Sequence, residues 1–512
     1  MTKQIIPAIL LLLALMLLPT LLARAQAPDQ FLITLAMPDK RERTALLQEG
    51  FEVWGATTDS ITVAGDRETL RALQKRGEQI TAVTPLAFPP DFDDYHDYAE
   101  MVSELHGLAA TYPDITHLQS IGQSHQGREL WMLRITDRPH EIEADEKGIL
   151  IYGGTHAREH LSIEQALFLA NDLVQNYGVE GEATNLIDNR DIWILPNLNP
   201  DGSEYDIDQW HSQPPYWRKN RRDNQDGTWG VDLNRNFGYR WGCCGGSSSY
   251  TGSNTYRGPA PFSEPESQAL RDFVIAHPRL TMSFSLHTYG ELILYPYGYT
   301  YLDLPPDMEA DDLQIFRAMS SKIASLNGYT AQQASDLYVV DGEHTDWFYG
   351  ERRIYAVTWE LYPSSSNPGF YPPDDIIPAQ TERNRAALRY GVSLADDPAK
   401  SVGEGADMTP PAIQILTPDQ GEQIFADVPI HVTVIITDNV DVTTVEYLID
   451  DKPIAVRNGD DFSAALTLTS GTYELTARAF DAAHWQSLSD PVQLDVIPAQ
   501  TIYLPLWRRE TP

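Results

Sequence analysis

Apolar positions in the central part of the chain follow two periods, one typical of helices and one typical of buried strands. Helical spacing is expected over residues 95–111, 162–177, 264–276, 311–326 and 378–394. Apolar runs typical of buried strands lie at 149–152, 191–196, 280–286 and 354–360, and a hairpin is expected from 116–120 and 129–136. This alternation predicts an α/β fold, with a mixed sheet flanked by helices. The irregular connections are longer than a simple link requires, which indicates function.

Two smaller units flank this central region. Residues 31–83 have the order strand, helix, strand, strand, helix, strand, which is ferredoxin-like. Residues 411–498 have short alternating strands separated by turns, a β-sandwich pattern that resembles bacterial immunoglobulin-like modules. The N-terminal unit is interpreted as a pro-segment, because it lies between the apolar run at 5–22, which is typical of a signal peptide, and the large domain. A standalone binding domain is the alternative.

The first residues have the pattern of a secretory signal peptide. Lys3 precedes an apolar run at 5–22, and the small residues Ala23, Ala25 and Ala27 permit cleavage after Ala25 or Ala27. An uncleaved membrane anchor is the alternative; Pro7, Pro19 and the small residues after the run argue against it. No later segment approaches the roughly 20 apolar residues that span a bilayer. The expected division is a signal peptide (1–27), a pro-segment and processing linker (28–90), a central domain (91–397), a linker (398–410), the sandwich (411–498) and a tail (499–512).

Composition narrows the range of partners. The chain has 512 residues, too many for one hydrophobic core, and 42% of them are hydrophobic, as in globular proteins. Its formal net charge of −36 would repel nucleic acid and anionic membranes. We expect a secreted monomer with neither as a partner. The two cysteines, Cys243 and Cys244, are adjacent, and a vicinal disulfide that shapes a loop is favoured over metal binding, because no second pair exists.

One stretch carries the first candidate chemistry. Residues 149–152 form a buried strand that runs into two glycines and then His156, Arg158, Glu159 and His160. A turn at a strand end is where an open α/β sheet usually presents its functional groups. His156 and Glu159 could bind one zinc ion.

Spacing alone does not establish such a site. His140 and Glu143 have the same spacing within an acidic run, with no strand before them. Catalytic zinc takes three protein ligands. His287 ends the strand expected at 280–286, and a neighbouring parallel strand would bring it beside His156.

The sequence as a whole resembles the zinc metallocarboxypeptidases, most of all the secreted bacterial carboxypeptidase T type. The resemblance covers about 91–394 and rests on motifs in family order: His156 and Glu159 with His287 downstream, WRKNRR (217–222), GVDLNRNF (230–237), LHTYGELILYPYG (286–298), SDLYVVDGEHTDW (335–347) and VTWELYP (357–363). It implies the zinc carboxypeptidase fold, with an eight-stranded-type mixed sheet. It also implies hydrolysis of the C-terminal peptide bond of peptides and proteins that have a free C-terminus.

The resemblance also implies the catalytic residues. His156, Glu159 and His287 would hold one zinc ion per catalytic domain. Glu360 would accept the proton of the attacking water and deliver it to the leaving amine. Arg221 is chosen from its run as the residue that stabilises the oxyanion. His160 is interpreted as packing beside the site, because water must keep the fourth metal position.

Substrate-binding residues follow from the same resemblance. Asn234 and Arg235 correspond to a clamp for the terminal carboxylate, and Tyr338 to a tyrosine that closes over the substrate. Arg158 and Tyr289 correspond to residues that line neighbouring subsites. Asp232 is expected to orient a zinc-binding histidine through its second nitrogen.

Specificity and calcium binding are further expectations from the resemblance. Thr345 replaces the aspartate or large aliphatic residue of relatives, and Glu343 corresponds to an acidic position, so release of large apolar residues together with Arg and Lys is predicted. Carboxylates suit calcium. The two candidate calcium groups are Asp93, Tyr95 and Glu100, and Glu143, Asp145 and Glu146.

Two other functions stay open on the same fold. One is a zinc amidase that acts on cell-wall peptides; the clamp pair and Tyr338 argue against it. The other is a binding module without catalysis, which predicts loss of a zinc ligand or of the catalytic glutamate. The sequence lacks neither.

Overall fold

The computed structural model of the chain describes residues 30–86, 92–141, 143, 146–208, 216–402, 411–438, 442–458, 462–481 and 486–498. The expected signal peptide, the C-terminal tail and most of both linkers lie outside these residues. Within the described part of the chain, no helix is both long and apolar enough to cross a membrane.

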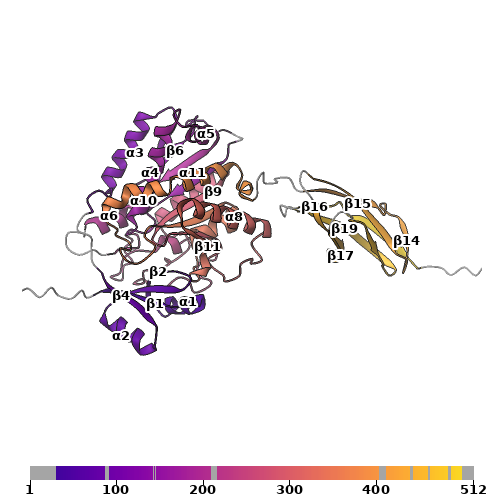
Figure 1. The fold of residues 1–512 in the computed structure, drawn as a ribbon, viewed down its shortest axis with the longest axis horizontal. Coiled ribbons are helices and arrows are strands. Elements are labelled where there is room, and N and C mark those ends of the chain that lie inside the picture. The colour runs from indigo at the N-terminus through magenta and orange to yellow at the C-terminus, as the bar shows by residue number, and fades with distance from the viewer. Residues whose placement is uncertain are drawn as a thin grey trace, which may run out of the picture.

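An eight-stranded sheet forms the centre of the large domain (Figure 1). Its strand order is β11-β10-β12-β9-β7-β8-β6-β5. The strands are β5 (Thr116–Gln123), β6 (Glu129–Ile135), β7 (Gly148–Tyr152), β8 (Asp191–Leu195), β9 (Leu280–Thr288), β10 (Leu292–Tyr295), β11 (Thr330–Gln333) and β12 (Tyr355–Leu361). The neighbours β8, β7, β9 and β12 are parallel, whereas β10 with β12, β6 with β8 and β5 with β6 are antiparallel. The sheet is therefore mixed, which confirms the predicted fold class.

Helices cover both faces of this sheet because its central strands alternate their buried side chains. Ile149 and Ile151 of β7 pack into one core, and Leu150 and Tyr152 pack into the other. The helices are α3 (Tyr98–Thr111), α4 (His160–Asn176), α5 (Gly181–Asn189), α6 (Pro200–Asp208), α7 (Pro265–Ala276), α8 (Ala310–Asn327), α9 (His344–Arg352), α10 (Ile377–Arg383) and α11 (Arg385–Ser393). The single closing helix expected at 378–394 is thus divided into α10 and α11.

Strand register brings the candidate chemistry to one edge of the sheet. The parallel strands β7 and β9 pair Tyr152 with Ser285, two residues before His287. On its other side β9 pairs with β12, and His287 lies opposite Glu360. The carboxyl ends of three adjacent strands therefore meet, as in other open α/β sheets.

The N-terminal unit has the predicted ferredoxin-like order. It consists of β1 (Phe31–Ala36), α1 (Lys40–Gln48), β2 (Glu52–Ala56), β3 (Ser60–Gly65), α2 (Arg67–Arg76) and β4 (Ile80–Pro85). Its sheet is antiparallel with the order β2-β3-β1-β4, and it has an apolar core of its own. In Figure 1 this indigo unit lies directly against the central domain.

The C-terminal unit is a β-sandwich, drawn in yellow in Figure 1. One sheet has the order β13-β15-β18; the other has β14-β21-β19-β16-β17, with β20 beside β19. The strands are β13 (Ala412–Thr417), β14 (Gln423–Phe425), β15 (Ile430–Thr437), β16 (Val442–Ile449), β17 (Lys452–Asn458), β18 (Ala464–Leu466), β19 (Gly471–Asp481), β20 (Gln486–Leu488) and β21 (Val492–Ile497). Inward-facing side chains of both sheets form an apolar core of their own.

Candidate metal centre and its surroundings

Three buried side chains converge at the carboxyl ends of β7 and β9. His156, Glu159 and His287 each offer one ligand atom, and these atoms lie within 4.8 Å of one another. The two carboxylate oxygens of Glu159 lie 2.8 Å from Nδ1 of His156 and 2.8 Å from Nδ1 of His287. The two Nδ1 atoms are 3.1 Å apart.

The hydrogen bonds behind this cluster show whether the three groups fit a metal ion. His156 Nε2 lies 3.2 Å from Asp232 Oδ1, and His287 Nε2 lies 3.0 Å from Ser285 Oγ. When these outer nitrogens carry the protons, both Nδ1 lone pairs point at the carboxylate of Glu159. Two imidazoles and a carboxylate whose lone pairs face one another form a donor set that fits zinc.

Electrostatics favour a cation at this point. Burial acts to raise the pKa of Glu159, but the imidazoles of His156 and His287 hold it below its ordinary value. Burial lowers the pKa of His287, which keeps its imidazole neutral and able to donate a lone pair. Burial also acts to raise the pKa of Asp232, whereas the guanidinium groups of Arg218 and Arg235 lower it, so that carboxylate is ionised.

A small cavity of about 70 Å³ adjoins the cluster. It is lined by polar residues of the central domain and by four residues of strand β2. Its polar and aromatic lining residues include His156, Glu159, Arg218, Asn234, Arg235, Tyr289, Tyr338, Glu343 and Glu360. Burial, and next the carboxylate of Glu159, raise the pKa of Glu360 well above its ordinary value, as suits a proton acceptor beside the metal.

Arg221 does not take the position predicted for it. Its guanidinium lies over the ring of Tyr205 at 3.7 Å and near those of Trp217 and Trp229. Arg218 lines the cavity instead, and its Nε donates to Asp232 Oδ2 at 3.0 Å. The structure therefore does not bring Arg221 to the cavity, because Tyr205, Trp217 and Trp229 hold its guanidinium outside the lining.

Arg158 and Tyr289 lie where the N-terminal unit meets the central domain. The guanidinium of Arg158 is buried between the rings of Phe370, at 4.1 Å, and Trp54, at 4.6 Å. The ring of Tyr289 packs against Phe370 and directly against the backbone of Gly55. These two predicted subsite residues are therefore covered by β2.

Asn234 is held by the first residue of α9, and Arg235 by the loop that contains Gly246. Asn234 Oδ1 accepts hydrogen bonds from the backbone nitrogen of His344, at 3.2 Å, and from its Nδ1, at 2.6 Å. Arg235 Nε donates to the carbonyl oxygen of Gly246 at 2.9 Å. His344 went unrecognised in the sequence because a lone histidine inside a longer motif has no spacing signal.

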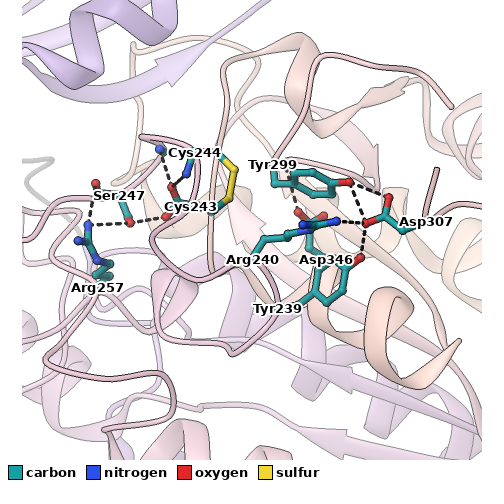
Figure 2. The surroundings of a disulfide bond; sticks show 11 residues. Tyr239, Arg240, Cys243, Cys244, Ser247, Arg257, Tyr299, Asp307 and Asp346 are labelled. Carbon is teal, nitrogen blue, oxygen red and sulfur yellow. Dashed lines mark hydrogen bonds and ion pairs between the residues drawn. A yellow bond between two sulfur atoms is a disulfide. The ribbon is translucent and has the colours of Figure 1, made fainter. Parts of the chain in front are cut away.

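The vicinal disulfide shapes the loop that supports this pair (Figure 2). Cys243 and Cys244 are joined, as expected. The backbone nitrogens of Cys244 and Gly246 donate to Asp341 Oδ2 at 3.0 and 2.8 Å, and the hydroxyl of Ser247 donates to Oδ1 of the same carboxylate. The loop is thereby fixed to the segment that runs from Tyr338 into α9.

The two residues predicted to set specificity have different positions. Glu343 lines the cavity, and burial raises the pKa of its carboxyl group. Thr345 is buried in the first turn of α9, outside that lining. Asp346, which Figure 2 also shows, accepts hydrogen bonds from the backbone nitrogens of Gly298 and Tyr299 at 2.9 and 3.0 Å.

Other predicted residues lie apart from this cavity. His160 Nε2 is 2.9 Å from Asp206 Oδ2, which agrees with a packing role. Of the first calcium group, Tyr95 donates to the carbonyl of Pro372 at 3.1 Å, Glu100 belongs to the capping box of α3, and Asp93 is exposed. Of the second group, Glu143 pairs with Arg138, Glu146 lies beside Thr136, and Asp145 is outside the described residues.

A second group of the same residue types lies elsewhere in the central domain. His125, Glu264 and Glu266 also offer ligand atoms within 4.8 Å of one another, and both glutamates are fully buried. Within the described residues, these two groups of three are the candidates for holding a metal ion. The sequence motifs gave no indication of the second group.

Comparison with known proteins identifies the family. Residues 101–387 match the family model described as zinc carboxypeptidase, and residues 411–477 match a bacterial Ig domain. A zinc carboxypeptidase from Saccharothrix mutabilis subsp. capreolus is 36% identical over 405 residues, covering 74% of this chain and 92% of that protein. Carboxypeptidase B from Astacus astacus is 31% identical over 299 residues, covering 57% of this chain and 94% of that protein.

Solved structures agree with the sequence comparison. Carboxypeptidase A from Helicoverpa armigera has the same fold, with a TM-score of 0.63 at 24% identity, over 73% of this chain and 99% of that one. Bovine thrombin-activatable fibrinolysis inhibitor gives 0.52 at 28% identity, over 59% of this chain and 97% of that one. The chain belongs to the zinc carboxypeptidase family and is a zinc-dependent metallocarboxypeptidase. The family acts on peptides with a free C-terminus.

Proposed function

We propose that this protein removes C-terminal residues one at a time from peptides and proteins, with His156, Glu159 and His287 holding the zinc ion. The observation that carries this assignment is the convergence of two Nδ1 lone pairs on the carboxylate of Glu159, with Glu360 opposite His287 on the adjacent strand. When bound, zinc polarises the scissile carbonyl and acidifies the attacking water.

Side chains of the protein transfer the proton, stabilise the oxyanion and bind the substrate. Glu360 accepts the proton of the attacking water and passes it to the leaving amine. Arg218, rather than Arg221, donates to the oxyanion that develops on the scissile carbonyl. Asn234 and Arg235 bind the terminal carboxylate, and Tyr338 covers the bound residue.

Peptide ladders analysed by mass spectrometry test this function, with and without a zinc chelator. One-by-one loss from the C-terminus that stops with the chelator is expected; internal cuts would contradict it. Glu360→Gln should lower kcat by about 10²–10⁴-fold while one zinc per chain is retained. A protein that trims only cell-wall peptides would be an amidase, and one that binds peptides without trimming them would be a binding module.

Specificity for large apolar residues together with Arg and Lys rests on Glu343. Its carboxyl group lies in the cavity beside apolar residues such as Leu294 and Val340, so the pocket offers both kinds of contact. Rates on matched peptides ending in Phe, Arg or Glu measure this preference. Glu343→Gln should reduce release of Arg selectively, with Thr345→Val as the control; a preference for a C-terminal Glu would refute the proposal.

The N-terminal unit is proposed to keep the precursor inactive. Residues Val53 to Ala56 of β2 line the cavity, and Trp54 stacks on Arg158. Helix α1 contacts the segment beside Tyr338: Thr44 Oγ1 accepts from the nitrogen of Val339 at 3.0 Å. Proteolysis between residues 76 and 91 should raise activity at least about tenfold, because β2 would no longer cover the cleft. Unchanged activity after cleavage would instead favour a standalone binding domain.

Secretion is proposed from the leader sequence. A secreted, processed protein would lose its first residues after Ala25 or Ala27. The signal-peptide cleavage site is measured by N-terminal sequencing of protein that is recovered outside the cell and still carries its pro-segment. An intact Met1 in membrane-bound material would show an anchor instead.

Calcium binding is proposed for the two acidic groups that include Glu100 and Glu146. The capping box already uses the carboxylate of Glu100, and burial raises the pKa of Glu146 to about 7. A calcium ion would have to displace these interactions. Thermal melting with a calcium-selective chelator, at constant zinc content, decides the matter: a lowered Tm supports calcium, and an unchanged Tm removes it.

A further inference from the structure

His344 is a buried histidine for which the proposed chemistry has no role. It is the first residue of α9 and is 1% exposed. One face of its ring stacks on His287, with the centroids 5.5 Å apart and the planes at 9°. Its two nitrogens contact Asn234 of the proposed carboxylate clamp and Thr358 of the strand that carries Glu360.

The hydrogen bonds fix which atoms of this group carry protons. The backbone N–H of His344 can only donate, so the atom of Asn234 that lies 3.2 Å from it must be the amide oxygen. Nδ1 of His344 lies 2.6 Å from the same oxygen and must therefore carry a proton. Nε2 is then an acceptor, and the hydroxyl of Thr358, at 3.3 Å, donates to it.

The same bonds fix the orientation of the Asn234 amide. With two donors on its oxygen, a flip of the amide would place its NH₂ group against two other N–H groups. The oxygen therefore stays on the His344 side, and the NH₂ group is turned the other way, toward the cavity that Asn234 lines. A carboxylate has only acceptor oxygens, so this orientation presents donors to it.

We propose that His344 is a positioning residue for substrate recognition: it locks the Asn234 amide so that both its N–H groups face the terminal carboxylate of the substrate. The inference rests on the proposed function, in which Asn234 binds that carboxylate. His344 itself touches neither the substrate nor the zinc ion. Its effect should therefore appear in substrate binding rather than in turnover.

Three substitutions of His344 separate this role from simple packing. The side-chain nitrogen of Asn reaches the place of Nδ1, whereas that of Gln reaches the place of Nε2. We expect His344→Leu to raise KM for a blocked dipeptide ending in Phe by about tenfold, the scale of one buried hydrogen bond, with kcat within about twofold. His344→Asn should restore much of the lost affinity, and His344→Gln should not.

Controls cover the metal centre and the packing of the ring. Zinc content and thermal melting are measured for every variant, because the ring stacks on His287. Tyr152→Leu removes a ring whose centroid lies 5.5 Å from that of the same imidazole without removing any of its hydrogen-bond partners, and it should leave KM unchanged. Inhibition constants of a product-like peptide acid and its C-terminal amide provide a second measurement: only the acid should lose affinity in His344→Leu.

The results for these variants test the positioning role of His344 separately from the proposed role of Asn234 in binding the carboxylate. If Asn234→Ala leaves KM unchanged, the clamp assignment is wrong. If Asn234→Ala raises KM but His344→Leu does not, the positioning role is wrong and the clamp stands. Equal rescue by His344→Asn and His344→Gln, or equal weakening of the acid and the amide, would also overturn the positioning role. His344→Asn, which keeps the donor, supplies the test if His344→Leu fails to fold.

Discussion

Two groups in this protein contain the same residue types at similar distances but differ in what fills the space between them. In the first, formed by His156, Glu159 and His287, the partners Asp232 and Ser285 lie behind the imidazoles, so lone pairs face inward. In the second, formed by His125, Glu264 and Glu266, both carboxylate oxygens of Glu264 already have hydrogen-bond partners outside the group. The atoms of a metal site must be both close together and free to donate.

The second group is a hydrogen-bonded support. Glu264 Oε1 accepts from Arg222 at 2.8 Å and from Ser263 at 2.6 Å. Its Oε2 lies 2.7 Å from His125 Nε2 and accepts from Asn220 Nδ2 at 2.9 Å. Each oxygen of Glu264 already has two partners, so this group holds the loop at 217–222 against the start of α7.

One loop joins the two groups. Within the run 217–222, Arg218 reaches Asp232 behind the metal ligands, and Arg222 reaches Glu264 in the second group. Arg221 points to neither and lies on Tyr205. The second group thus anchors the loop that places an arginine in the active-site cavity.

The largest expected difference between the groups comes from removing one glutamate of each. Glu159→Gln should leave zinc well below one equivalent per chain and lower kcat/KM by about 10³-fold or more, because a ligand is lost. Glu264→Gln should keep one zinc and most activity, but lower the free energy of unfolding by about 1–3 kcal/mol. Metal analysis and denaturant unfolding measure both. Equal zinc loss in the two variants would contradict the distinction.

The arginine loop gives the next largest effect. Arg218→Ala should lower kcat by about 10²–10³-fold, as for loss of an oxyanion donor. Arg221→Ala should change kcat less than threefold, by about the same factor as Arg222→Ala, and lower stability by about 0.5–2 kcal/mol through lost ring contacts. Steady-state kinetics of the three variants measure this, and an inactive Arg221→Ala with a normal Arg218→Ala would show that Arg221 is the oxyanion donor.

Substitution of Asp232 tests whether the hydrogen-bond partner of a metal ligand contributes to zinc affinity. Asp232→Asn should weaken zinc binding by about 10–100-fold, because the amide is a poorer acceptor for His156 Nε2–H. Competition with a chelator of known affinity measures the change. Asp206→Asn, next to His160 and outside the cavity lining, is the matched control and should leave zinc affinity unchanged.

The smallest expected effect is a pH dependence of the free energy of unfolding that comes from Glu266 in the second group. Burial raises the pKa of Glu266 from its ordinary 4.5 to about 7. Its contribution to stability is therefore complete below pH 4.5 and is lost as the pH rises through about 7. Glu266→Gln should remove about 1–3 kcal/mol of that decline, measured by unfolding at several pH values. A decline of the same size in the variant would show that Glu266 does not titrate in this range.

The strands that carry the metal ligands were predictable from the sequence, because strand patterns and motifs agree there. The runs 149–152, 280–286 and 354–360 correspond to β7, β9 and β12, and parallel pairing of β7 with β9 brings His287 to His156 as predicted. The sequence did not distinguish Arg218 from Arg221, because both lie in one run and only the course of the loop determines which of them reaches the cavity. Strands β10 and β11 and helix α9 were not predicted, and neither was the role of His344 in α9, because short elements and lone histidines have no periodic signal.

One contact of the N-terminal unit with the central domain is made to main-chain atoms. The buried guanidinium of Arg43 donates to the carbonyl oxygens of Met37, Thr58, Asp336 and Leu337. Carbonyl groups are common to every amino acid, so side chains beside Tyr338 can diverge without breaking this contact. A lineage could therefore acquire new preferences for the released residue while the same covering unit continued to fit.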